Sequence, residues 1–94
     1  MEGDLIPKKK LSPRAERIIH ASAALYGERG HGRMAEAIGI SKQMMSFIVN
    51  GDRVVSDEVE GKVAEALVRE AERLRKTADR LEDIAIKMRE KLVG

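Results

Sequence analysis

The C-terminal part of this 94-residue chain lacks helix-breaking residues over an unusual length. After Gly61, neither Gly nor Pro occurs until Gly94. Ser56 is a good N-cap, and Asp57 and Glu58 follow it where acids favour the positive end of a helix dipole. The stretch therefore predicts one helix of about 36 residues and roughly 55 Å, about three times the average globular length.

A heptad repeat of apolar residues runs along this stretch. One seam position holds Ala64, Ala71, Ala78, Ala85 and Leu92, and the other holds Leu67, Leu74, Leu81 and Met88. A repeat sustained over about four heptads predicts a coiled coil. We therefore expect residues 68–94 to form a dimerisation helix through Ala71, Leu74, Ala78, Leu81, Ala85, Met88 and Leu92.

Several outcomes for this tail stay open. Alternation of Ala with Leu predicts a close helix pair, and both parallel and antiparallel orientations stay open. Ile84 and Ile86 widen the apolar side near its end, which leaves additional partners or a higher oligomer open. The tail is also long enough to fold back on the rest of the chain. Self-association is the preferred prediction, because a lone helix exposing such a side needs a partner surface.

Composition points to an aliphatic, helical protein. Tyr26 and Phe47 are the only aromatic residues, and cysteine is absent. The absence of cysteine excludes disulfides, thiolate catalysis and cysteine-ligated metals, and it fits a reducing compartment. No apolar run approaches the roughly 20 residues of a membrane helix, and residues 1–10 contain no signal-peptide core. We therefore expect a cytoplasmic, all-α protein without membrane contact.

Short helices are predicted before the long one. Ser12-Pro13 is a helix start, and its apolar stripe continues to Tyr26. The stretch 27–32 has three glycines and predicts a loop, and residues 33–38 predict a short helix. Before Ser12, residues 1–11 with the Lys8-Lys9-Lys10 run predict a flexible basic arm, either solvated or lying on DNA backbone.

Residues 31–51 predict a helix-turn-helix. Gly39 permits the tight turn, and Ser41 caps a second helix over residues 42–49. Ala35 suits a close helix crossing, and Ile40, Met45 and Ile48 are predicted to hold the second helix on the core. The outward positions of that helix are then Ser41, Lys42, Gln43, Ser46 and Phe47.

The run from Met34 to Gly51 resembles the Cro and phage-repressor type helix-turn-helix family. The resemblance lies in the spacing of Ala35, Gly39 and Asn50-Gly51, and it extends over about residues 14–67. It implies a DNA-binding domain at 12–67, a four-helix unit whose last helix extends into the tail. The implied function is a sequence-specific regulator that binds double-stranded DNA. The simplest form is a dimeric repressor on a palindromic operator, with half-sites about 34–36 Å apart.

The recognition helix supplies the predicted base contacts. Gln43 is the leading reader, because Gln pairs bidentately with adenine, and Lys42 and Ser46 come next. Phe47 stands where the family often has Arg. It is predicted either to contact a thymine methyl or to be buried against the first helix or a partner subunit. Backbone contacts are predicted for His31 (often Gln in the family), Arg33, Ser41, Asn50 and Arg53.

Charge and histidine placement bear on the alternatives. Net charge is only +2, although residues 1–56 carry nine Lys or Arg and six acids. Neither His20 nor His31 stands with a nucleophile or carboxylate at useful spacing, so we expect no enzyme, metal, cofactor or small-molecule ligand. Two alternatives remain: a protein-interaction module, and an antitoxin-like or accessory phage regulator whose tail binds a partner protein.

Overall fold

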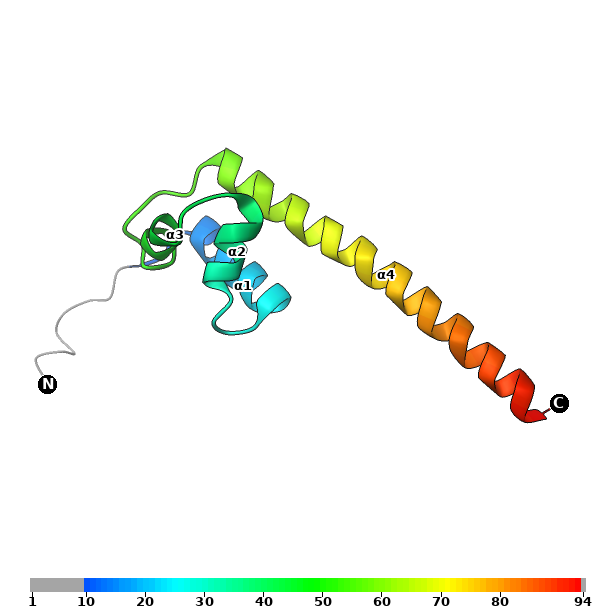
Figure 1. The fold of residues 1–94 in the computed structure, drawn as a ribbon. Helices are drawn as coiled ribbons and strands as arrows, with labels where there is room; N and C mark the ends of the chain where they lie inside the picture. Colours follow the sequence, from blue (N-terminus) through cyan, green and yellow to red (C-terminus); the bar gives the residue numbers. More distant parts are fainter. Residues whose placement is uncertain (1–9, 94) are drawn as a thin grey trace, which may run out of the picture.

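The protein consists of a small helical head and a long helical tail (Figure 1). The structure is a computed structural model and describes residues 10–93. Over this range it contains four helices and no strand: α1 (Pro13–Tyr26), α2 (His31–Ile38), α3 (Lys42–Val49) and α4 (Asp57–Val93). The predicted all-α class with a long C-terminal helix is confirmed. We call residues 11–67 the head and residues 68–93 the tail.

Serine hydroxyls cap the N-termini of three of the helices. Ser12 Oγ accepts a hydrogen bond from the Ala15 amide at 3.1 Å, at the start of α1. Ser41 Oγ accepts from Met44 at 3.0 Å before α3, and Ser56 Oγ accepts from Val59 at 3.1 Å before α4. Each bond satisfies an amide that has no partner inside its helix. The three predicted N-caps are therefore confirmed.

Helix α2 starts earlier than the sequence predicts. The loop between α1 and α2 ends at Gly30, so His31 and Gly32 belong to the helix. Gly30 is buried, and a Cβ there would lie 2.5 Å from Tyr26 Cβ. Its carbonyl accepts from the Met34 amide at 2.9 Å and closes the first turn. The predicted loop over 27–32 was therefore too long, because the fit of Gly30 against α1 starts the helix without a side-chain cap.

Gly39 forms the turn between α2 and α3. Its φ of 77° lies in the left-handed region that favours glycine, and a Cβ there would meet nothing within 4 Å. The Ile40 amide donates to the Ala35 carbonyl at 3.0 Å, which closes the end of α2. The predicted helix–turn–helix path is confirmed.

The core of the head is aliphatic and lies where the four helices meet. Its buried residues are Ala15, Ile18, Ala21, Met34, Ala35, Ile38, Met45, Ile48, Val55, Val59, Val63 and Ala66. Ala35 is fully buried, as a close crossing requires. Ser22 is also buried, and its hydroxyl donates to the Ile18 carbonyl at 2.8 Å, so its burial leaves no polar group unsatisfied.

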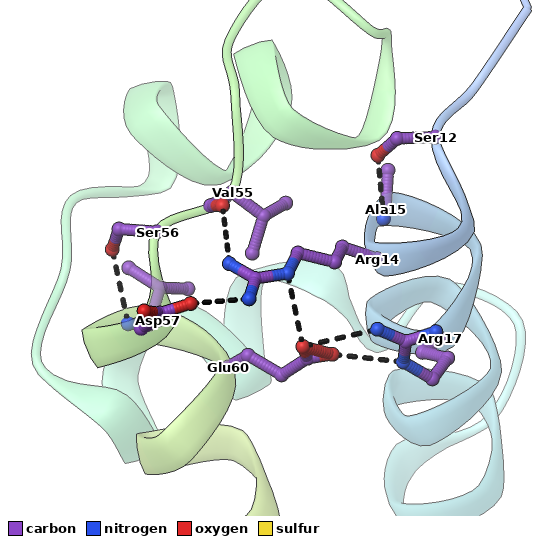
Figure 2. Close-up of polar contacts among 9 residues, drawn as sticks. Ser12, Arg14, Ala15, Arg17, Val55, Ser56, Asp57 and Glu60 are labelled. Carbon is purple, nitrogen blue, oxygen red and sulfur yellow. Dashed lines mark hydrogen bonds and ion pairs between the residues drawn. The ribbon is translucent and has the colours of Figure 1, made fainter.

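Two arginines of α1 join it to the start of α4 (Figure 2). Arg14 donates to the Val55 carbonyl at 3.2 Å and forms ion pairs with Asp57 and, at 3.4 Å, with Glu60. Arg17 Nε donates to Glu60 Oε2 at 2.8 Å. Both arginines contribute to the excess of basic residues in residues 1–56, but in the structure they form ion pairs with acids of the same chain.

The tail leaves the head as a continuation of α4. Only the first turns of α4 contribute to the core, through Val59, Val63 and Ala66. Beyond them the helix projects away from α1–α3 (Figure 1), and the described residues extend over 71 × 35 × 20 Å. The alternative in which the tail folds back on the head is therefore not the arrangement found.

Candidate nucleic-acid interface

Helix α3 has one buried side and one exposed side. Met45 and Ile48 are each 1% exposed and hold the helix on the core. Gln43, Ser46 and Phe47 are exposed on its other side. The helix lies on the side of the head away from the tail (Figure 1). Its outer surface therefore combines an amide, a hydroxyl and an aromatic ring on a helix held firmly from behind.

Phe47 is 40% exposed and does not join the core cluster. Burial of this side chain against the first helix, one of the predicted outcomes, is therefore not found. Contact with a thymine methyl and cover by a partner subunit both remain predictions. Either contact would remove an exposed aromatic surface from water.

The start of α3 carries a cation. Lys42 is exposed, and its Nζ lies 3.8 Å from Glu36 Oε1, with both side chains 71% exposed. An ion pair so open to water contributes little to stability. The aliphatic stem of Lys42 passes over the start of α2, because a Cβ on Gly32 would lie 3.5 Å from Lys42 Cε.

Asn50 shapes the end of α3. It is the C-cap residue, and its Nδ2 donates to Ser46 Oγ at 3.3 Å. The Asp52 amide donates to the Phe47 carbonyl at 2.8 Å and closes the last turn. A hydroxyl that accepts one bond can still donate another, so Ser46 keeps a donor for a ligand while Asn50 orients it.

The predicted backbone-contact residues lie on three segments: the first turn of α2, the two caps of α3 and the loop after α3. Ser41 caps α3, and Asn50 follows its last turn. Arg33 is exposed in the first turn of α2, and His31 is half-buried as its first residue. Arg53 is exposed in the loop between α3 and α4. Ser41 and Asn50 thus lie at the two ends of α3, and Arg53 lies in the loop that follows it.

Lys10 joins Arg53 at a shallow cleft of about 210 Å³. Ser12, Asp52 and Val54 also line this cleft, which separates the start of α1 from the loop after α3. Lys10 belongs to the predicted arm over 1–11, most of which lies outside the described residues. The placement of Lys10 and Arg53 at one cleft has no signal in the sequence, because it depends on how α1 packs beside that loop.

The predicted dimerisation residues lie along the tail. Ala71 and Ala85 are half-buried, and Ala78 is exposed. The large members of the seam are open to water: Leu74 is 54%, Leu81 61%, Met88 62% and Leu92 86% exposed. Ile84 and Ile86 add to this exposed apolar surface. We call the seam from Leu67 to Leu92 the tail seam.

The tail seam begins at an apolar cleft between α1 and α4. The cleft has a volume of about 290 Å³ and is lined by Ile18, Ala21, Val63, Ala64 and Leu67. Arg17 and Glu60 also line it, and their ion pair affects both groups. The hydrogen bond from Arg17 lowers the pKa of Glu60, and the same bond raises the pKa of Arg17.

Comparisons with known proteins add no family assignment. Models of protein families, curated proteins and solved structures were compared with the chain, and none of them matches it. Within residues 10–93, no group of three or more His, Cys, Asp or Glu is placed to hold a metal ion. In the same range, no helix combines the length and apolarity that a membrane span requires.

Proposed function

We propose that this chain is a sequence-specific regulator of transcription that binds double-stranded DNA as a dimer, in the simplest case a repressor. The observation that carries the proposal is the geometry of α3. Met45 and Ile48 hold the helix on the core, while Gln43, Ser46 and Phe47 project outward. A helix that enters the major groove needs this combination of firm support and a projecting polar face.

Each outward side chain has a chemical role in this proposal. Gln43 reads adenine through its N6 and N7 atoms, which match the donor and acceptor of the amide. Phe47 contacts a thymine methyl, and Ser46 adds a hydrogen bond to a base edge. Lys42, at the start of the helix, reaches either a guanine or a phosphate.

Phosphate contacts fix the orientation of the recognition helix. Arg33 and Arg53 are exposed cations. Arg33 precedes α3 in the sequence, and Arg53 follows it. Ser41 and Asn50 supply polar groups at the two ends of that helix, and His31 supplies another at the start of α2. Contacts of this kind position a protein on the duplex without reading its sequence.

The proposed dimer doubles the number of bases that are read. A single short helix contacts few base pairs, whereas a two-fold dimer reads two half-sites of a palindrome. The exposed tail seam supports self-association, because its large apolar side chains beyond Leu67 are more than half exposed in the single chain.

The test is selection of bound sequences from random duplex DNA with the full chain. We expect a palindromic preference whose affinity falls steeply with salt. The variant Gln43→Ala should relax that preference at a cost of about 1–3 kcal/mol on the selected site. His20→Ala, on the exposed surface of α1, is the control. An unchanged preference removes Gln43 from base reading, and absence of salt-dependent duplex binding overturns the function.

The exposed tail also supports a second candidate function. Its apolar side fits a protein partner, as in a protein-interaction module or in an antitoxin-like or accessory phage regulator. The module without DNA binding is separated from the main proposal by salt-dependent binding to duplex DNA. Recovery of a stoichiometric second protein with the purified chain would favour the antitoxin-like candidate.

A further inference from the structure

We propose that a second copy of this chain covers the tail seam in the antiparallel orientation, with Ala78 opposite the partner's Leu81. This inference rests on the self-association part of the proposed function, and it adds the orientation and register that the heptad alone leaves open. Helix α4 is continuous from Asp57 to Val93, so the whole seam is available to one straight partner helix.

The alternation of small and large side chains favours this arrangement. In the proposed register, Ala71 faces the partner's Met88 and Ala85 faces the partner's Leu74, while Ala78 faces the partner's Leu81. Each of these layers then holds one small and one large side chain, so the helices keep a constant separation. A parallel pair would instead alternate Ala–Ala with Leu–Leu layers and leave space at every Ala layer.

Charges beside the seam select the same register. In an antiparallel pair, a heptad position that flanks the seam faces the same heptad position of the partner helix. Arg75 and Glu82 share one such position, so Arg75 faces the partner's Glu82, and Glu82 faces the partner's Arg75. Glu70 likewise meets the partner's Lys91, although Glu70 also pairs with Arg73 in its own chain. Symmetry doubles both contacts, and no like charges face each other at these positions.

Other arrangements of the same helices match their charges less well. Sliding the partner by one heptad in one direction puts Arg75 opposite the partner's Arg75. Sliding it in the other direction puts Arg75 opposite the partner's Arg89, and Glu82 opposite the partner's Glu82. An in-register parallel pair offers only the contact between Glu70 and the partner's Arg75. The proposed register is therefore favoured twice, by attraction between its own charges and by repulsion between charges in the shifted registers.

The end of the proposed interface reaches the head. The partner's Leu92 packs on Leu67, which lines the apolar cleft between α1 and α4. In the single chain Leu92 is 86% exposed, and the cleft walls from Ile18 and Ala21 are apolar. The second copy thus covers a surface that is continuous from the tail into the head.

This arrangement separates the two DNA-reading surfaces. The two-fold axis passes between residues 79 and 80, so the two copies of Ala66 lie roughly 40 Å apart along the helix axis. Helix α3 lies on the far side of the head from the tail (Figure 1), so the recognition helices are farther apart still. The half-sites should therefore be separated by more than the roughly 34–36 Å of adjacent half-sites.

The absence of cysteine in the chain permits a direct test of orientation. The full-length variants Ala71→Cys and Met88→Cys are purified separately, and each is oxidised alone and in an equimolar mixture. We expect a disulfide-linked dimer only in the mixture, since residue 71 faces residue 88 of the second copy. Self-linked dimers of both variants alone would indicate a parallel pair, and a monomer in sedimentation would exclude any pair; either result overturns the proposal.

A charge swap tests the register without cysteines. Arg75→Glu and Glu82→Arg should each weaken the dimer by about three- to thirty-fold, and the double variant should restore its affinity. Lys76→Glu, on the outer side of the tail, is the control. In a parallel pair the double variant would stay weak, because Arg75 would then face Glu70 rather than Glu82.

These measurements need no DNA, so the two proposals fail separately. A palindromic DNA preference together with self-linked cysteine variants would leave the function standing and remove the antiparallel pair. Mixed linkage without duplex binding would leave the antiparallel pair standing and remove the proposed function.

Discussion

The position of Arg53 relative to other charged residues becomes clear only from the structure. Arg53 is exposed after α3 and lines a cleft together with Lys10 and Asp52, so two cations and one acid lie at one edge of the proposed interface. By contrast, Arg14 and Arg17 are held by Asp57 and Glu60. The cations available for phosphate are therefore those around α3 rather than those of α1.

Replacing Arg53 with Ala should weaken binding to all duplex sequences alike. Loss of one phosphate contact per protomer lowers the slope of log affinity against log salt by about 0.9, or about 2 for a dimer. The measurement is affinity for a selected and an unrelated duplex over a range of salt concentrations. Arg80→Ala in the tail is the matched control, and a loss confined to the selected sequence would contradict a phosphate role.

At the scale of elements, the turn between α2 and α3 depends on one glycine. Gly39 has a φ of 77°, and no atom lies within 4 Å of a Cβ placed there, so the constraint comes from the backbone alone. Gly61 lies inside α4 with equally open surroundings and no such conformation. The two glycines thus form a natural comparison.

Opposite effects on stability are expected from alanine at these two positions. Gly39→Ala should lower the free energy of unfolding by about 1–2 kcal/mol, because an L-residue is strained in the left-handed region. Gly61→Ala should raise it by about 1 kcal/mol, since Ala favours a helix interior. Denaturant unfolding at one fixed protein concentration measures both. Equal stability of the Gly39 variant and the parent would refute the strain.

The joint between α1 and α4 should make stability depend on pH. The hydrogen bond from Arg17 lowers the pKa of Glu60 in the folded state, so this glutamate stabilises the fold above its ordinary pKa of 4.5. The contribution is lost as pH falls below that value and through the folded pKa. The variant Glu60→Gln should therefore lose less of its free energy of unfolding than the parent does when the pH is lowered.

Unfolding curves between about pH 3 and 7 measure this dependence. The difference between the parent and Glu60→Gln should be largest near neutral pH and should shrink as the carboxyl is protonated. Glu65→Gln, an exposed position further along α4, is the matched control. A constant difference across the pH range would show that Glu60 acts without its charge.

At the scale of the whole molecule, the head carries its own core, and the proposed assembly depends on the tail. The core residues end at Ala66, and the large side chains of the tail seam are exposed in the single chain. Assembly and folding of the head should therefore respond to different substitutions.

Replacing Leu74 and Leu81 together with Lys should dissociate the dimer without unfolding the head. Burial of one Leu contributes about 1.5–3 kcal/mol to the free energy of association, and a dimer buries four such side chains. The affinity of the dimer should therefore fall at least about 100-fold. Sedimentation measures assembly, and DNA binding to a palindrome should weaken in parallel. Lys76→Glu is the control, and an unchanged dimer would place the interface elsewhere.

The sequence by itself determined the order and most boundaries of the helices. Ser12, Ser41 and Ser56 cap helices as predicted, and Gly39 ends α2, because each of these signals acts through bonds to residues only a few positions away. The predicted recognition helix over 42–49 and its outward residues follow from the same local periodicity.

Tertiary structure alone decided the features that join distant parts of the chain. Helix α2 begins at His31 because Gly30 fits against α1, and Phe47 stays exposed because the core closes without it. The ion pairs of α1 with α4, and the cleft that Lys10 and Arg53 both line, involve residues more than 40 positions apart. Such contacts depend on how helices pack in space, and a local sequence pattern does not contain that information.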